Sequence, residues 1–250
     1  MSTAARELQF LLAEPERRLL RRLAARLPDR VTSDLLTLIG VAGAAGAGAA
    51  YALSTYSPWW LAAASLMLAV NWFGDSLDGT LARVRRAERP RYGYYLDHMV
   101  DAFATAAIGL GIGLSAYVEL EVALLLVVGY LALSINVYLE SAVFEVFRLA
   151  YGRIGPTEAR ILLVLANVAL LVVSLALPGA RWVIPVTNGA ALAAVAGMLG
   201  ILLVRCAANL HRLARLEPLR RAVSGATAAR SSRSTLRLAW GGQAAIKRPT

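Results

Sequence analysis

Six long apolar runs constrain this chain more than any other feature of its sequence. They cover residues 35–53, 59–81, 96–116, 122–149, 161–177 and 182–204. A membrane-spanning helix needs about 20 mainly apolar residues, and runs this long and this numerous do not fit the core of a water-soluble chain of 250 residues. The sequence therefore predicts an all-α polytopic integral membrane protein, with six transmembrane helices in one domain over residues 31–206.

The segments that flank this predicted domain are polar and basic. Within residues 1–30, leucines recur at approximate helical spacing with arginines on the other side. This pattern predicts an amphipathic helix on the cytoplasmic membrane surface; a solvated basic helix without membrane contact is the alternative. A cleaved secretory signal is not expected ahead of six spans. Residues 207–250 lose apolar periodicity and are expected to form a basic, flexible cytoplasmic tail.

The net charge of +10 raises the question of nucleic-acid binding, and the placement of the basic residues argues against it. Seven arginines precede the first run, five lie between the second and third runs, and ten basic residues follow the last run. The connections on the other side hold only Arg181. By the positive-inside rule both termini are cytoplasmic, in a cell inner membrane or its equivalent. The charge then serves topology and attraction to anionic membrane lipids.

Four aspartates lie at the predicted cytoplasmic ends of the second and third runs. Asp75 and Asp78 are three residues apart and Asp97 and Asp101 are four apart, so each pair lies on one helical face. A connection that contains Pro90 folds the two helix ends back beside each other, so the pairs are expected to converge. The active site is therefore expected at the cytoplasmic face.

The convergence of four carboxylates has a chemical consequence. Their charges repel strongly in low-dielectric surroundings unless a cation neutralises them. Oxygen ligands without a His or Cys pair favour magnesium, manganese or calcium over zinc. Magnesium usually binds through carboxylates and substrate phosphates together. The aspartates therefore indicate a phosphorylated substrate.

The spacing D-x2-D-G-x2-A-R-x9-G-x3-D-x3-D resembles the complete signature of the CDP-alcohol phosphotransferase family. It is filled by Asp75, Asp78, Gly79, Ala82, Arg83, Gly93, Asp97 and Asp101. The resemblance implies an enzyme of phospholipid synthesis that uses one or two Mg²⁺ or Mn²⁺ ions. A hydroxyl acceptor would attack the phosphorus of a CDP-linked donor, and CMP would leave. The resemblance also implies an N-terminal surface helix, six spans and, commonly, a homodimer.

The same resemblance implies roles for the aspartates. Asp75, Asp78 and Asp97 would hold the metal and the CDP diphosphate. Asp101 would complete the metal site or act as the general base.

The other signature positions would serve the nucleotide. Gly79 and Ala82 would let it approach the backbone, and Arg83 would contact phosphate. Gly93 would keep the second helix end narrow.

The sequence departs from the family pattern before the first run. Many relatives carry T-P-N-x-x-T there, and this chain has VTSDLLT, with Ser33 and Asp34 in place of proline and asparagine and Thr37 retained. A nucleotide contact from this element is therefore in doubt. We expect Ser33 or Asp34 to be a helix N-cap.

The sequence is compatible with two readings of the substrate alcohol. Candidate substrate residues are His98, Glu140, Glu145, Arg153, Glu158 and Arg160. In one reading, LDHMVD and GPTE are similar to elements of the aminoalcohol phosphotransferases, which act on diacylglycerol, and Glu140 or Glu145 could face the ammonium group. In the other, Arg153 and Arg160 could hold an anionic acceptor such as an inositol or glycerol phosphate, with CDP-diacylglycerol as the donor.

Three further interpretations concern an ion pair, the packing of the first run and another functional class. Glu145 could pair with Arg148, three residues further along the chain. The small residues of GVAGAAGAGAA in the first run favour packing within the chain over a dimer contact. A cation transporter is the alternative from another functional class, because carboxylates within helical bundles also line ion paths.

Overall fold

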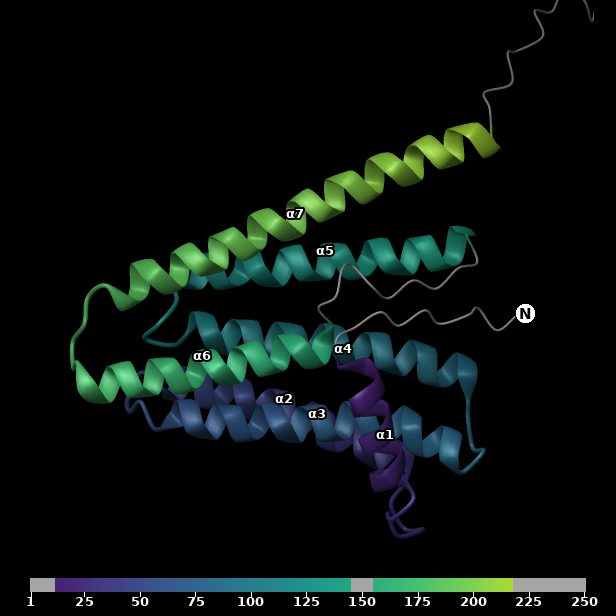
Figure 1. Ribbon diagram of the computed structural model, residues 1–250, viewed down its shortest axis with the longest axis horizontal. Helices are drawn as coiled ribbons and strands as arrows, with labels where there is room; N and C mark the ends of the chain where they lie inside the picture. Colours follow the sequence, from purple (N-terminus) through teal and green to yellow (C-terminus); the bar gives the residue numbers. More distant parts are fainter. Residues whose placement is uncertain (1–11, 145–154, 218–250) are drawn as a thin grey trace, which may run out of the picture. The chain divides into compact units, whose positions relative to one another are not determined.

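The computed structural model describes residues 12–144 and 155–217 of the chain. Within these ranges the secondary structure is entirely helical, as Figure 1 shows. The helices are α1 (Ala13–Ala24), α2 (Ser33–Leu53), α3 (Trp60–Val84), α4 (Pro90–Gly113), α5 (Leu120–Phe144), α6 (Pro156–Ala176) and α7 (Val183–Leu216). The chain divides into two units, residues 1–206 and 207–250, and all of the site described below lies in the first.

Each of the six predicted apolar runs coincides with one of the helices α2 to α7, which confirms the all-α class. Among the described residues, α2, α5, α6 and α7 are long and apolar enough to cross a membrane. Helices α3 and α4 carry the four aspartates within their sequences and do not meet this standard. Six spans therefore stay a prediction.

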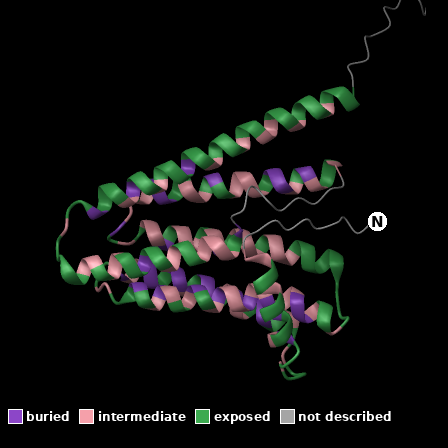
Figure 2. Cartoon of the chain, in the orientation of Figure 1, coloured by how far each residue is buried: buried purple, intermediate pink, exposed green. Residues whose placement is uncertain are grey.

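Helices α2 and α3 form the tightest pair of the first unit, and Figure 2 shows buried positions gathered along them. Glycines allow this approach: a methyl group on Gly43 would lie 2.8 Å from Cα of Asn71, and one on Gly40 would lie 3.1 Å from the amide nitrogen of Asp75. The small residues of α2 thus pack within the chain, as expected. Helix α4 also contacts α2, α5 contacts α4, and α6 contacts α3.

Helix α1 packs on the end of the α2–α3 pair. Leu20 and Ala24 are buried beside Leu36, Leu77 and Leu81. The arginines Arg18, Arg21 and Arg22 are exposed. Within the described residues, α1 covers Ala13–Ala24 of the predicted segment 1–30, and its contact with a membrane surface stays a prediction.

A tight turn after α3 directs the chain into α4. The amide of Ala87 donates to the carbonyl of Ala82 (2.9 Å), and the amide of Arg86 donates to that of Arg83 (3.2 Å). This is the Schellman hydrogen-bond pattern, whose C′ residue adopts a left-handed conformation. Arg86 occupies that position with φ 53°. The turn brings Asp97 and Asp101 of α4 back toward Asp75 and Asp78 of α3.

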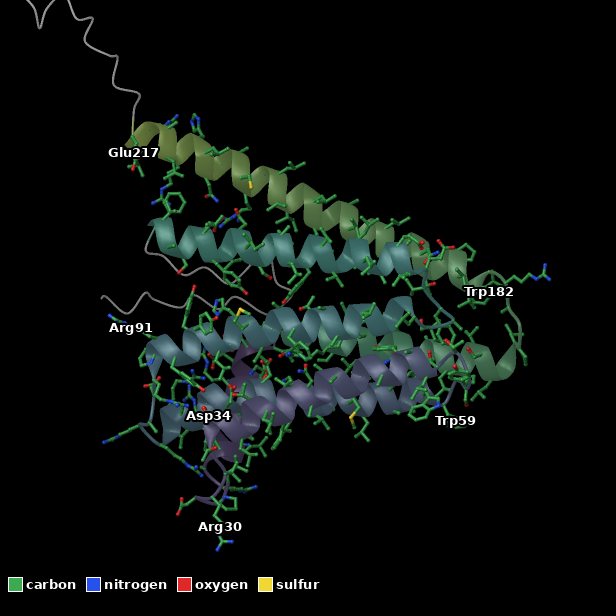
Figure 3. The ribbon with its side chains drawn as sticks, turned by 180° about the vertical axis from the view of Figure 1, so that it is seen from behind. Arg30, Asp34, Trp59, Arg91, Trp182 and Glu217 are labelled. Carbon is green, nitrogen blue, oxygen red and sulfur yellow. The ribbon has the colours of Figure 1, made fainter. Side chains whose placement is uncertain are left out.

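The two ends of the first unit differ in chemistry. Figure 3 shows Asp34 and Arg91 at one end, and Trp59 and Trp182 at the other. Between them the outer faces of the helices expose large apolar side chains, such as Leu38 (63% exposed) and Val128 (63% exposed). Such an apolar exterior is suited to lipid rather than to water.

Candidate functional site

An ion pair joins the first signature aspartate to α6. Nη2 of Arg160 lies 2.7 Å from Oδ2 of Asp75, and both side chains are largely buried. Nε of Arg160 also donates to Oδ1 of Asn71 (2.9 Å), one turn before Asp75 on α3. The amide group of Asn71 in turn donates to the carbonyl of Gly40 in α2 (3.0 Å). Three helices therefore fix the surroundings of Asp75.

The second aspartate, Asp78, is held by the start of α2. The hydroxyl of Thr37 donates to its Oδ2 at 2.5 Å, and the hydroxyl of Ser33 donates to its backbone carbonyl at 2.7 Å. The backbone amide of Gly79 donates to its Oδ1. Both carboxylate oxygens therefore accept hydrogen bonds that orient the group.

The predicted helix cap at Ser33 or Asp34 is wrong. Thr32 is the N-cap of α2, and its side chain accepts a hydrogen bond of 3.2 Å from the amide of Leu35. Ser33 is thereby released to bind Asp78, and Asp34 forms an ion pair with Arg89 at the start of α4.

Asp97 and Asp101 of α4 complete a cluster of four carboxylates. Asp101 lies within electrostatic range of the other three aspartates and of Arg160. The same holds for Asp78 with respect to Asp75 and Asp97. The structure thus brings together the four aspartates that the sequence pattern predicts. They outnumber the nearby Arg160, so the cluster keeps a surplus of negative charge.

The donor chemistry of this cluster fits a hard divalent cation, because every candidate ligand is a carboxylate oxygen. In the described part of the chain, no three His, Cys, Asp or Glu side chains are close enough together to form a coordination group. The aspartates are instead held by protein partners, as in the pairing of Asp75 with Arg160. Metal binding would require the carboxylates to approach one another.

The remaining signature residues border this cluster. Gly79 and Ala82 are half-buried on the same helix as Asp75, and the exposed Arg83 donates to the hydroxyl of Thr80 (3.2 Å). A methyl group on Gly79 would lie 3.5 Å from Nη1 of Arg83, an ordinary contact. A methyl group on Gly93 would meet no atom within 4 Å. Packing within the described chain therefore does not explain either glycine.

The candidate substrate residues fall in different places. Arg160 lies at the aspartates, whereas the buried Glu140 pairs with Arg205 of α7, whose Nε lies 3.2 Å from Oε1. His98 packs against the rings of Tyr94 and Tyr138, with centroids 4.1 and 4.2 Å away.

Glu158 serves the start of α6, where one carboxylate oxygen accepts from the amide of Gly155 (3.0 Å). Glu145 and Arg153, as well as the suggested pairing of Glu145 with Arg148, lie outside the described residues.

Sequence reasoning missed three residues around the cluster. Asn71 is buried between Gly40 and Arg160, and Glu16 of α1 contacts α3 and α6. Tyr130 of α5 lies within electrostatic range of Asp101 and Arg160. Asn71 had a usable signal, since it is a polar residue inside an apolar run and one helical turn before Asp75.

Among the described residues, helices of membrane-spanning length and a cluster of aspartates on α3 and α4 define a helical membrane protein with an acidic site. Residues 30–212 match the model of the CDP-alcohol phosphatidyltransferase family. The chain belongs to this family and is an integral membrane protein.

The chain is also similar in sequence to a curated relative. The chain is similar to a phosphatidylinositol phosphate synthase from Cutibacterium acnes (strain DSM 16379 / KPA171202), with 36% identity over 90 residues. The match covers 36% of this chain and 41% of the relative. It therefore spans less than half of each protein.

Proposed function

We propose that this protein is a phospholipid-synthesising transferase that moves a phosphatidyl group from CDP-diacylglycerol to the hydroxyl of a polar alcohol phosphate, with release of CMP. The observation that carries the proposal is the cluster of Asp75, Asp78, Asp97 and Asp101, which fills the family signature at the facing ends of α3 and α4. A site at the end of a helical bundle gives a lipid donor access from the bilayer and a polar acceptor access from water.

The aspartates divide between binding and proton transfer. Asp75, Asp78 and Asp97 are assigned to one or two Mg²⁺ or Mn²⁺ ions, with Asp101 nearby. The bound ion supplies electrostatic stabilisation of the negative charge that develops on phosphate oxygens. Gly79 and Ala82 leave room beside α3 for the nucleotide. Gly93 likewise leaves space beside the start of α4, where a methyl group would meet no atom within 4 Å.

The reaction needs one bond to form and one to break. The acceptor hydroxyl oxygen bonds to the phosphorus that carries diacylglycerol, and the bond from this phosphorus to the oxygen of CMP breaks. Asp101 takes the hydroxyl proton, since it is the signature carboxylate deepest along α4 and carries no assigned diphosphate contact. Arg83, exposed beside Gly79, is placed to contact a donor phosphate.

Three observations favour an alcohol phosphate as the acceptor over a CDP-aminoalcohol as the donor. The guanidinium of Arg160 lies at the aspartate cluster, where it can attract a phosphate. The carboxylate of Glu140, the candidate partner for an ammonium group, binds Arg205 of α7, whereas Arg160 binds a signature aspartate directly. The similarity to a phosphatidylinositol phosphate synthase points the same way. Glu158 is assigned a structural role by its contact with Gly155, whereas His98, whose Nδ1 lies 3.8 Å from Oδ2 of Asp97, is kept as the alternative base.

The proposed setting is a six-span protein with both termini and the aspartates on the cytoplasmic side. The exposed arginines of α1 favour contact with anionic lipid headgroups. A homodimer is part of this proposal by family resemblance.

The test is a reaction panel with purified protein in detergent and Mg²⁺. CDP-diacylglycerol or CDP-choline is supplied with inositol phosphate, glycerol phosphate, inositol or diacylglycerol, and CMP is measured by mass spectrometry. We expect CMP only from CDP-diacylglycerol combined with an alcohol phosphate. CMP from CDP-choline with diacylglycerol would overturn the substrate assignment, and no CMP from any pair would overturn the activity.

A further inference from the structure

The side chain of Glu16 in α1 connects three helices through one carboxylate oxygen. Its Oε1 accepts hydrogen bonds from Nε1 of Trp72 (2.7 Å) and from the hydroxyl of Ser76 (3.4 Å), both on α3. The same oxygen accepts from the hydroxyl of Thr157 in the first turn of α6 (2.7 Å). The carboxylate of Glu16 in α1 therefore bridges the start of α6 and the middle of α3.

A second link runs between the same elements. The backbone amide of Leu12 donates to Oε1 of Glu158 at 2.9 Å, and Oε2 of Glu158 accepts from the amide of Gly155. The segment just before α1 is thus tied to the first turn of α6. Two hydrogen bonds therefore link the start of α1 to the first turn of α6. The residues they join are 146 and 141 positions apart in the sequence.

Arg160 and Glu16 bind neighbouring ridges of α3. Asn71 and Asp75 lie four residues apart on one ridge of α3, and Trp72 and Ser76 lie four apart on the next ridge. Arg160 binds the first ridge directly, whereas the described hydrogen bond of the Thr157 side chain reaches the second ridge through Glu16. Thr157 and Arg160 are three residues apart and share one face of α6. Glu16 thereby fixes how the first turn of α6 sits across α3.

We infer that Glu16 is a positioning residue for the active site: it holds the first turn of α6 so that the guanidinium of Arg160 stays on Asp75. The inference rests on the proposed function, which places Asp75 and Arg160 in the binding site. Glu16 itself lies on the far side of Trp72 and Ser76 and has no contact with the four aspartates among its described hydrogen bonds. The N-terminal helix thus belongs to the site's support and not only to the membrane surface.

The experiment measures how well Arg160 is protected, without metal or substrate. Phenylglyoxal modifies exposed guanidinium groups, and the peptide that contains Arg160 is quantified by mass spectrometry. The side chain of Arg160 is 15% exposed in the intact network. We expect Glu16→Ala to raise its modification rate by about tenfold, since hydrogen bonds to a charged group are lost and the turn opens more often.

Three further variants separate positioning from general instability. Glu16→Gln keeps a side-chain acceptor and should restore most of the protection. Thr157→Val removes only the α6 partner and should reproduce the effect of Glu16→Ala, with no further increase in the double variant. Glu14→Ala is the matched control, because Glu14 lies on the same helix, is exposed, and bonds with Arg17. It should leave Arg160 protected.

Measurements of activity test whether the hydrogen bonds of Glu16 matter for the reaction. The kcat/KM for the donor should fall with Glu16→Ala, and the same substitution should have no further effect in an Arg160→Gln background. Unchanged Arg160 modification in both Glu16→Ala and Thr157→Val would overturn the inference, as would full additivity with Arg160→Gln. Absence of CMP release by the unmodified protein would overturn the proposed function alone, since the modification assay still reads the network.

Discussion

Thr37 of α2 donates a 2.5 Å hydrogen bond to Oδ2 of Asp78 on α3, so the first helix of the bundle orients a carboxylate of the second. Groups that orient a metal ligand typically change metal affinity by about 10–100-fold when removed. If Asp78 holds the proposed ion, Thr37→Val should weaken Mn²⁺ binding by about tenfold or more. Thr37→Ser keeps the hydroxyl and is the control. Equal affinities in both variants, measured by calorimetry, would contradict this role.

Replacing Asp78 itself should affect two ligands together. If the diphosphate is held largely through the ion, Asp78→Asn weakens Mn²⁺ and CDP-donor binding in parallel. Calorimetry with each ligand, beside CMP release, checks this expectation. Glu88→Gln, which removes an exposed carboxylate from the α3–α4 connection, should leave both affinities unchanged. Near-normal Mg²⁺-dependent turnover by Asp78→Asn would refute the assignment.

Asp101 should behave differently from its three neighbours. A general base acts on the acceptor's proton during the reaction, so Asp101→Asn should lower turnover by about 10²–10⁴-fold. Donor and Mn²⁺ affinities should stay within several-fold of the unmodified protein. A parallel collapse of affinity and turnover would make Asp101 principally a metal ligand, and His98 would be the next candidate for the base.

Arg86 offers a prediction about stability. A residue other than glycine pays about 1–2 kcal/mol for a left-handed conformation, and Arg86 has φ 53° at the end of α3. Relative to Arg86→Ala, the variant Arg86→Gly should be about 1 kcal/mol more stable, which corresponds to about 2–4 °C in Tm for a domain of this size. Thermal unfolding in detergent measures the difference. A lower Tm for Arg86→Gly than for Arg86→Ala would show that the turn is not strained.

The proposed topology predicts where reporters will be found. Reporters at either terminus should be cytoplasmic, and reporters inserted before Leu120 or at Gly179 should lie on the opposite side. Gly179 suits an insertion, since a methyl group there would meet no atom within 4 Å. A C-terminal reporter on the outer side would remove the six-span topology and the cytoplasmic placement of the aspartates with it.

The helices and the aspartate cluster could be predicted because both depend on local rules. Apolar runs of spanning length located α2 to α7, and spacings of three and four residues placed Asp75 beside Asp78 and Asp97 beside Asp101. The approach of the two pairs followed from a short connection between neighbouring helices. These features require only periodicity and chain continuity.

The supporting contacts could not be predicted in the same way. Glu16 and Thr157 are 141 residues apart, and Asn71 and Arg160 are 89 apart. No local pattern indicates which polar residue of α1 meets α6, because that depends on how the helices pack. The cap of α2 was misplaced for a related reason: Ser33 and Thr32 are both good caps locally, and the contact of Ser33 with Asp78 decides between them.

The backbones of Gly48 in α2 and Gly111 in α4 lie in close contact, toward the end of α4 that is remote from the aspartates. Asp97 is fourteen residues from Gly111, or about 21 Å along the helix at 1.5 Å per residue. A tilt of about 3° at that contact therefore displaces Asp97 by about 1 Å over this length. The glycine contacts between α2 and α3 keep Asp75 and Asp78 in place meanwhile. If the proposed ion binds, we expect α4 to tilt about this contact and to bring Asp97 and Asp101 closer to Asp75 and Asp78.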